Sequence, residues 1–552
     1  MSIEAVGVLF QFIGGLGMFL YGMNAMADGL QKSAGSRLQQ LLGVLTSNKL
    51  LGVLVGAAIT AIIQSSSATT VMVVGFVNAG IINLTQAVGI IMGANIGTTV
   101  TSWIVSMSEW GEMMKPEFFA PLLVGIGAGV TMFAKSSKKK QAGEILIGFG
   151  LLFIGLDFMS SSIKPYRDAP IFAQAFAVLG RNPILGILTG AAVTAIIQSS
   201  SASVGILQTL ALNGVVNWQS AVFITLGQNI GTCVTALLSS VGAHKTAKRA
   251  AVIHLLFNCV GAVIFGILMF ILFIARPELA ASHINSVEIS VFHTIFNITN
   301  TIILFPFSAL LVKLSYVLVK EKQESAGASD VEGEMQRHLD SRILETPSFA
   351  IEHAENEVVR MGQTALMNLK IAGEALLQNN QFETDEVMKN EETINHMQNM
   401  LTDYLVKINN LSLNDQQHLL VKNLFYTIGD IERIGDHCQN LAELAADKIK
   451  NQIFFSEEAQ KELEEMLQAA VASVEHAVKS RELHDMFEVR QVVQSEEVVD
   501  NLEEDLRERH IERLSNNQCR TETGVIFLDV LSNLERVSDH ALNIAGYVRD
   551  EL

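Results

Sequence analysis

The chain has 552 residues, 49% of them hydrophobic, and a formal net charge of −18. Residues 1–320 carry 17 Lys+Arg and 10 Asp+Glu, a net of +7, and residues 321–552 carry the other 21 and 46, a net of −25. The first part therefore has a membrane composition, and the second has the composition of a soluble helical protein. This division excludes a single soluble domain. The sequence also shows no nucleophile–base pair or nucleotide motif, so we expect neither an enzyme nor a nucleic-acid partner.

Membrane spans are predicted wherever an apolar stretch approaches the roughly 20 residues that cross a bilayer. The candidates are residues 4–26, 85–107, 118–134, 142–162, 218–242, 250–275 and 289–319, the last with Pro306 as an expected break. Two further apolar stretches, near 41–82 and 183–215, are interrupted by polar residues. These predict re-entrant hairpins. The fold expected is all-α: a polytopic membrane part followed by a soluble helical bundle.

The membrane part contains an internal repeat. GAAITAIIQSSSATT at 56–70 returns as GAAVTAIIQSSSASV at 190–204, and GANIGTTVT at 93–101 returns as GQNIGTCVT at 227–235. Both pairs have an offset of 134 residues (190 − 56 = 134 and 227 − 93 = 134). The predicted units are residues 4–134 and 142–275, with 289–319 as an additional span. Each unit is a span, a hairpin and two more spans.

Three full crossings in each unit place the second copy in the membrane from the opposite side. The loop charges agree, because Lys138–Lys140 and the group Lys245, Lys248 and Arg249 mark two loops as cytoplasmic. Inverted repeats with broken helices are the architecture of secondary transporters. We therefore expect a multi-pass protein of the cell (inner or plasma) membrane, in contact with the lipid bilayer, with its C-terminal domain in the cytoplasm.

The hairpin tips carry the strongest candidate site. Backbone groups at a tip have no helical partner, and lipid cannot satisfy them, so they must face a cavity, protein or ligand. A helix that begins at the tip directs free N–H groups at that cavity, and the side chains add neutral donors. This inventory suits an anion with several oxygens, and the freed carbonyl and hydroxyl oxygens equally suit sodium. The residues are Gln64, Ser65, Ser66, Ser67, Gln198, Ser199, Ser200 and Ser201.

A second polar element, Asn-Ile-Gly-Thr, opens a span in each repeat. Its Asn and Thr oxygens could bind sodium, or its glycines could simply allow close helix packing. Asp157 is an acid within a predicted span, either a cation or proton site or a hydrogen-bonding group between helices, and its repeat partner is Asn24. The candidate sodium ligands are Ser66, Thr69, Asn95, Thr98, Ser200, Asn229, Thr232 and Asp157.

These paired QSSS motifs, each followed by NIGT, resemble the sodium/phosphate cotransporter family related to the animal type II carriers. The resemblance covers roughly residues 1–320. It implies inorganic phosphate held between the two QSSS hairpins and co-transported sodium ions bound around the same tips. It gives no ground for choosing import over export.

The chain changes character after Lys320. Residues 321–344 are polar and rich in Gly, Ser and acids, which predicts a linker. Residues 345–552 show helical periodicity, and Pro347 is the last proline. Glu432-Arg433-Ile434-Gly435-Asp436-His437 returns as Glu535-Arg536-Val537-Ser538-Asp539-His540 at an offset of 103 (535 − 432 = 103), so two bundles of about three helices are expected.

The repeated acids lie one helical turn apart, on one face of a helix. They could bind a metal, or they could form a solvated stripe paired with Arg433 and Arg536. ERIGDHCQNLAEL and ERVSDHALNIAGY resemble the signature of PhoU-like domains, which regulate phosphate uptake. The resemblance implies a divalent or iron-type metal at Glu432, Asp436, Glu535 and Asp539.

The leading hypothesis is a sodium-coupled phosphate transporter with a cytoplasmic regulatory domain, and a homodimer is an expected assembly. Two alternatives stay open. One is a carrier of another oxyanion or small solute. The other is a membrane-anchored, metal-dependent signalling module.

Overall fold

The structure is a computed structural model that describes residues 3–34, 48–110, 115–166, 170–320, 335, 338–378 and 381–552. Within these ranges every named element is a helix, as the sequence predicted. The chain forms two compact units. The first comprises Met1–Ala326 and Asp340–Ser348, and the second comprises Gly327–Leu339 and Phe349–Leu552.

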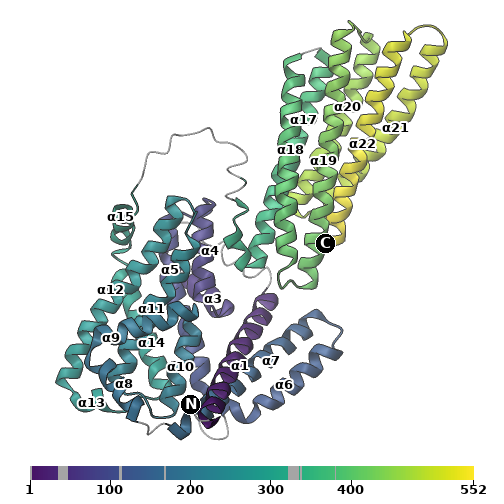
Figure 1. Cartoon of the computed structure of the whole chain (residues 1–552). Helices are drawn as coiled ribbons and strands as arrows, with labels where there is room; N and C mark the ends of the chain where they lie inside the picture. The colour runs from purple at the N-terminus through teal and green to yellow at the C-terminus, as the bar shows by residue number, and fades with distance from the viewer. Residues whose placement is uncertain are drawn as a thin grey trace. The chain divides into compact units, whose positions relative to one another are not determined.

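The first unit is built from helices of very different lengths (Figure 1). They are α1 (Ile3–Ala34), α3 (Lys49–Ile63), α4 (Ser66–Asn78), α5 (Leu84–Ser106), α6 (Pro116–Phe133), α7 (Ser137–Ile163), α8 (Pro170–Arg181), α9 (Pro183–Ile197), α10 (Ser200–Leu212), α11 (Trp218–Ser239), α12 (Lys245–Ala275), α13 (Pro277–Ala281), α14 (Ser286–Leu304) and α15 (Ser308–Leu318). The described part of this unit also contains three short 3-10 helices, η1 (Met107–Glu109), η3 (Lys164–Tyr166) and η4 (Ser341–Glu345). Among the described residues, six helices are long and apolar enough to cross a membrane: α1, α5, α7, α11, α12 and α14.

The two predicted hairpins are confirmed as pairs of short helices. The arms α3 and α4 have 15 and 13 residues, and so do α9 and α10. At about 1.5 Å per residue each arm is roughly 20 Å long, too short to cross the hydrocarbon core alone. Matching asparagines cap the helices of the two copies: Asn48 and Asn182 before α3 and α9, then Asn83 and Asn217 before α5 and α11.

Glycines let each hairpin pack closely against the long helix that follows it. A side chain at Gly93 of α5 would meet the Val53 carbonyl oxygen of α3 at 2.0 Å, and one at Gly227 of α11 would meet that of Ile187 at 1.9 Å. Gly97 approaches α3 in the same way. The glycines of the second polar element thus serve close helix packing, one of the two roles that the sequence left open.

The additional span is broken where Pro306 was expected to break it. Helix α14 ends at Leu304 and α15 begins at Ser308. A proline inside a helix removes a hydrogen bond and clashes with the preceding turn, which explains the break. Helix α14 is anchored at its start by Glu109, whose carboxylate accepts hydrogen bonds from the backbone N–H groups of Ser286 and Val287 at 3.2 and 3.3 Å.

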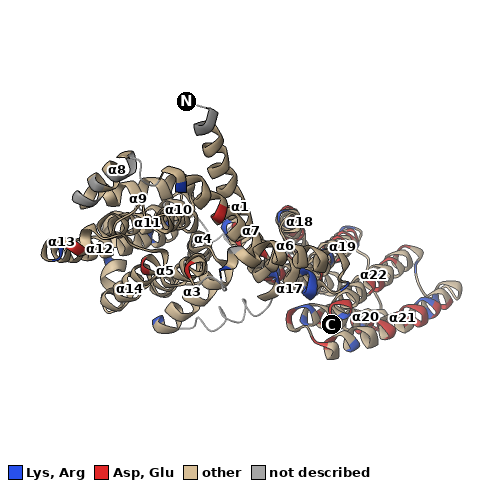
Figure 2. Cartoon of the chain, turned by 90° about the horizontal axis from the view of Figure 1, so that it is seen from below, with Lys and Arg blue, Asp and Glu red and all other residues tan. Residues whose placement is uncertain are grey.

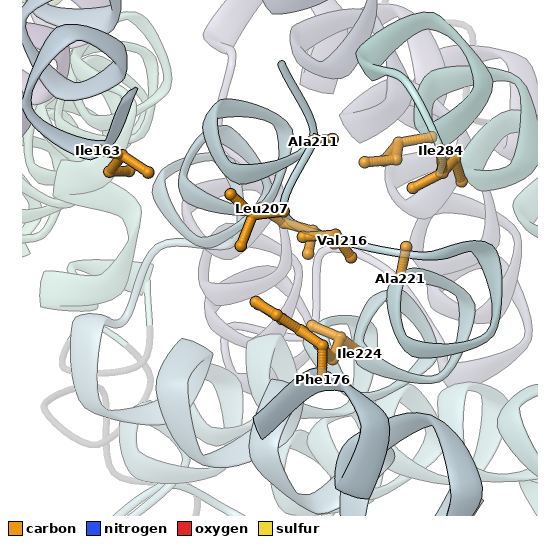
Figure 3. Close-up of a cluster of buried hydrophobic side chains, with 10 residues drawn as sticks. Ile163, Phe176, Leu207, Ala211, Val216, Ala221, Ile224 and Ile284 are labelled. Atoms are coloured by element: carbon orange, nitrogen blue, oxygen red, sulfur yellow. The ribbon is translucent and has the colours of Figure 1, made fainter. Parts of the chain in front are cut away.

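Apolar side chains lie both inside and outside the first unit. Figure 3 shows one internal cluster, in which Phe176 of α8 lies near Leu207 of α10 and Ile224 of α11. On the outside, Phe133 and Ile196 are each 82% exposed. Such apolar outer faces are expected of helices that contact lipid, because lipid tails solvate them.

Over its described residues, the second unit is a bundle of six long helices. They are α17 (Pro347–Gln378), α18 (Gln381–Asn409), α19 (Asp415–Lys450), α20 (Glu457–Leu483), α21 (Met486–Ser515) and α22 (Thr521–Glu551). Lys, Arg, Asp and Glu are dense along these helices and sparse over those of the first unit (Figure 2). The predicted linker at 321–344 lies largely outside the described residues. Its last residues, from Asp340 onwards, belong to the first unit.

Candidate anion site between the two hairpins

The two QSSS tips have the same backbone conformation. Gln64 has φ 57° and ψ 21°, and Gln198 has φ 56° and ψ 23°, both left-handed. Non-glycine residues rarely adopt a positive φ. This single left-handed residue ends the first arm of each hairpin and turns the chain so that the second arm begins two residues later.

The first serine of each tip caps the second arm. The Ser65 hydroxyl oxygen accepts a hydrogen bond from the Ala68 N–H at 3.1 Å, and that of Ser199 accepts one from Ala202 at 3.2 Å. These oxygens satisfy one of the free N–H groups that a helix start always leaves. The cap therefore fixes the start of each arm and leaves the neighbouring N–H groups for another partner.

The two tips meet around one cavity. The Ser66 and Ser200 hydroxyl oxygens, one from each hairpin, lie 3.5 Å apart, and both side chains are buried. The cavity has a volume of about 170 Å³, well above the roughly 10–15 Å³ that one water requires. Its lining consists of Met23, Asn24, Ala27, Ile63, Gln64, Ser65, Ser66, Ser67, Gln198, Ser199, Ser200 and Ser201. The structure thus brings together all eight residues predicted to hold the anion.

Gln64 is held on both sides of its amide group. Its carbonyl oxygen accepts a hydrogen bond from Thr101 at 3.0 Å, and its amide nitrogen donates to the backbone carbonyl of Ala61. Thr60 lies behind the tip and donates to Thr69 at 3.0 Å. Because these contacts tie the first hairpin to α5, the tip is held in place before any ligand binds.

The lining side chains are uncharged, and their polar groups are hydroxyls and amides. The starts of α4 and α10 add N–H groups and two partial positive charges to the same place. Helix N-termini and hydroxyls together bind oxyanions readily. The arrangement can bind and release an anion.

The predicted sodium ligands are not brought together in the same way. Asn95 donates to Ile91, Thr98 to Ala94, and Thr232 to Gln228, each within its own helix. Asn229 instead contacts α14, where it donates to Asn297 at 2.9 Å and lies 3.1 Å from His293. Of the predicted set, Ser66 and Ser200 line the cavity.

Asp157, a predicted sodium ligand, does not lie at the cavity, but its repeat partner does. Asp157 is exposed on α7 and does not line the cavity, whereas Asn24 of α1 does. The sequence signal for Asn24 is the repeat itself, which aligns it with Asp157. The prediction also missed Thr101. The second repeat has Thr235 at the same place, but both threonines lie three residues beyond the Asn-Ile-Gly-Thr element on which the prediction was based.

The second unit places the predicted metal ligands in two acidic clusters. In the first, Glu432 and Asp436 of α19 lie near Glu391 of α18, and burial followed by the Asp436 charge raises the pKa of Glu432. In the second, burial followed by the Asp539 charge raises the pKa of both Glu535 on α22 and Asp500 on α21. The sequence missed the acids on α18 and α21, because they lie outside the repeated signature.

Both motif arginines pair with these acids. Arg433 lies 3.1 Å from Asp436, and Arg536 lies 3.7 Å from Asp539. Both guanidinium groups are more than 60% exposed, so solvent screens the pairs strongly. The pKa values of Glu432 and Glu535 are raised even with these arginines present, and a bound cation would relieve the repulsion that contributes to the shift. Among the described residues, however, neither cluster brings three such ligand atoms within 4.8 Å of one another, so the structure does not assemble the predicted metal site.

The His and Asn residues of the repeated signature join the two halves of the bundle. His540 lies 2.7 Å from Asp430, and His437 lies 2.9 Å from Asn533. The two imidazole rings are 5.7 Å apart. These contacts cross between α19 and α22, so this part of the signature holds the bundle together.

A third acidic group lies elsewhere in the bundle. Glu355, His484 and Glu551 have ligand atoms within 4.8 Å of one another. Arg481 already lies between the two acids, 3.2 Å from Glu355 and 2.7 Å from Glu551. This group is therefore an ion-pair cluster whose positive charge is supplied by the chain itself.

A unit of apolar helices, with paired hairpins whose tips meet around one cavity, is followed by a separate helical bundle, and this arrangement is typical of a transport protein with an accessory domain. Comparison with known proteins is more specific. The Na+/Pi-cotransporter family matches residues 18–161 and 169–283, and the PhoU domain matches residues 358–445 and 463–548. Over its membrane unit the chain is therefore similar to the Na+/Pi-cotransporter family and over its second unit to the PhoU domain, which indicates a transport protein and not an enzyme.

Three relatives illustrate the similarity. A protein of Salmonella typhimurium named "Putative inorganic phosphate export protein YjbB" is 25% identical over 547 residues, 98% of both chains. YqeW of Bacillus subtilis, described as uncharacterized, is 29% identical over 57% of this chain and 99% of its own. Human "Sodium-dependent phosphate transport protein 2B" is 33% identical over 111 residues, 20% of this chain and 16% of that protein.

Among solved structures, PhoU from Pseudomonas aeruginosa matches 37% of this chain and 96% of its own, with 20% identity and a TM-score of 0.35.

Proposed function

We propose that the membrane unit is a sodium-coupled secondary transporter of inorganic phosphate, with the anion bound between the two hairpin tips. The observation that carries this proposal is the cavity lined from both sides by Gln-Ser-Ser-Ser. Two helix N-termini and several hydroxyl donors converge there without a fixed positive charge. Such a site holds an oxyanion by hydrogen bonds and can release it again.

Sodium coupling is supported by the charge balance of the site. A multiply charged anion is costly to place in a low-dielectric interior unless its charge is compensated. Since the lining side chains carry no charge, co-bound sodium would supply that compensation, with oxygens near the tips as ligands. The printed name of the human relative mentions sodium dependence, and that of the Salmonella relative mentions export. We therefore propose that flux direction follows the imposed gradients.

The test is phosphate flux in proteoliposomes with an imposed sodium gradient. We expect phosphate to accumulate on the side towards which sodium flows, and flux in the reverse direction when the gradient is reversed. Competing anions separate the alternatives. Inhibition of phosphate flux by arsenate alone would indicate a phosphate carrier, and inhibition by sulfate as well would indicate a general oxyanion carrier. Phosphate flux that does not depend on the sodium gradient would overturn the proposed coupling. Absence of any phosphate flux overturns the transport proposal.

We further propose that the second unit is cytoplasmic and regulates transport without forming the pathway. The eight tip residues all precede Lys320, so the cavity is complete without the bundle. The bundle's strong negative charge also disfavours an anion pathway along its surface. A divalent or iron-type metal would be held by Glu432, Asp436, Glu535 and Asp539, where it would neutralise the acidic clusters. Truncation after Lys320 is expected to retain phosphate flux and to lose its response to internal phosphate or metal.

A further inference from the structure

The end of α4 opposite the hairpin tip is held by a distant segment of the chain. Asn78, the last residue of α4, donates from its amide nitrogen to the Asp340 carboxylate at 2.7 Å. Its carbonyl oxygen accepts a hydrogen bond from the His244 N–H at 2.8 Å. One side chain therefore contacts both the loop after α11 and the segment that precedes the second unit. Asp340 is 6% exposed, so the Asn78–Asp340 bond is largely shielded from solvent, whereas the bond from His244 is exposed.

Arg342 extends the same contact to the end of α11. Its guanidinium group donates to Asp340 at 2.6 Å, to the Ser239 carbonyl at 2.6 Å and to the Val241 carbonyl at 3.4 Å. The last carbonyls of a helix carry a partial negative charge and lack helical partners, so a cation is favoured there. Arg342 thus joins the end of α4, the second arm of the first hairpin (hairpin 1), to the end of α11, the long helix of the second repeat.

The segment is also packed against α4. Ile343 of η4 is fully buried. A side chain at Gly75 would come within 3.1 Å of the Arg342 Cβ atom and 3.3 Å of the Ile343 Cγ1 atom. Glycine therefore leaves the space in which η4 sits. Polar and apolar contacts together define a docking site formed by Gly75, Asn78 and the carbonyls of Ser239 and Val241.

The other hairpin lacks this site. At the offset of 134 residues, Gly75 corresponds to Thr209 and Asn78 to Leu212. A threonine would fill the space that glycine leaves, and a leucine cannot make either hydrogen bond. The pseudo-symmetry of the repeats is broken where the segment docks, which is unexpected if the contact only fills space.

We propose that docking of Asp340–Thr346 on the ends of α4 and α11 restrains hairpin 1 and slows transport, and that the second unit controls this restraint. Helix α4 runs without interruption from the Ser66 tip to Asn78, so a restraint at one end acts on the other. Alternating access requires one repeat to move against the other. Helix α17 begins at Pro347, directly after the docked segment, which gives the second unit a covalent connection to it. The proposal rests on the transport role of the hairpins.

The test compares two single variants of the full-length chain. Asn78→Leu introduces the residue that the second repeat has at this place, and Arg342→Ala removes the guanidinium group. Asn213→Leu is the matched control, because Asn213 lies at the equivalent end of α10 and bonds Ser160 at 3.0 Å, away from the segment. We expect both test variants to raise the initial rate of phosphate flux about threefold or more, the scale of one lost hydrogen bond, and Arg342→Lys to have a smaller effect. The control should not raise the rate.

Hydrogen exchange provides a readout that does not depend on transport. Amides at 341–346 should exchange faster in Asn78→Leu and Arg342→Ala than in the unmodified chain, and those in Asn213→Leu should not. Faster exchange with unchanged or reduced flux would overturn the restraint. Unchanged exchange would overturn the docking itself. If the unmodified chain carries no phosphate, the proposed function fails, and the exchange experiment still decides whether the segment docks as described.

Discussion

Replacement of Ser66 and Ser200 by alanine isolates the hydroxyls that face the cavity. Their oxygens lie 3.5 Å apart across the two tips, whereas the Ser65 hydroxyl oxygen already caps α4. Ser66→Ala and Ser200→Ala should therefore remove ligand contacts and leave the helix caps in place. Ser65→Ala should instead remove a cap and destabilise the unit by about 1 kcal/mol.

The magnitude follows from the charge of the ligand. A hydrogen bond to a charged group contributes about 1.5–3 kcal/mol, and each 1.4 kcal/mol is tenfold in affinity. Each single variant should weaken apparent phosphate affinity by about 10-fold to about 150-fold. The loss of affinity in the double variant should be smaller than the product of the two single losses, because the hydroxyls face each other across the cavity and share one ligand.

The assay is the phosphate dependence of flux in proteoliposomes, with the amount of inserted protein measured for each variant. Ser106→Ala is the control, since Ser106 is equally buried on α5 but bonds only the Trp103 carbonyl, at 2.8 Å. It should transport like the unmodified protein. Unchanged phosphate dependence in both Ser66→Ala and Ser200→Ala, with normal insertion, would falsify the assignment of the cavity as the anion site.

Three other outcomes are expected. Asp436→Asn combined with Asp539→Asn should lower bound divalent metal in the purified protein and, in the presence of a chelator, raise its melting temperature, because like-charge repulsion is removed. Burial, aided by the nearby His338, lowers the pKa of His353 to about 4. Since the folded state then binds this proton less well than the unfolded state, stability should fall as the pH drops from about 6.5 to about 4, by up to ~3 kcal/mol. Calorimetry should show a smaller loss in His353→Gln. Cysteines at Ser136 and Ser282 should be labelled by impermeant reagents from opposite sides of the membrane, and labelling from one side would contradict inversion.

The helix pairs were predictable because their causes are local. A polar Gln-Ser run between apolar arms cannot continue a lipid-exposed helix, and Pro306 cannot sit inside one. The structure has both interruptions where the sequence placed them. That the two tips face one cavity was implied by the family resemblance and did not follow from the motifs alone.

The partners of these motifs were less predictable, because they depend on contacts between distant helices. Asn229 is bonded to α14, an element outside the repeat, whereas Asn95 bonds its own helix. Identical motif residues therefore have different surroundings. Composition likewise predicted a linker up to residue 344, but the buried position of Ile343 depends on a glycine more than 260 residues earlier, at Gly75.

The left-handed glutamines have a consequence for how these tips could evolve. A non-glycine residue with positive φ costs roughly 1–2 kcal/mol relative to a relaxed conformation, and glycine adopts it freely. Gln64→Gly should therefore recover backbone energy while giving up the amide that binds Thr101 and Ala61. If the amide matters to the site, the chain has accepted a less stable turn in order to keep a side chain there. At Gln64 the two lost hydrogen bonds, about 0.5–1.5 kcal/mol each, would offset the recovered backbone energy, so stability should change little while transport falls.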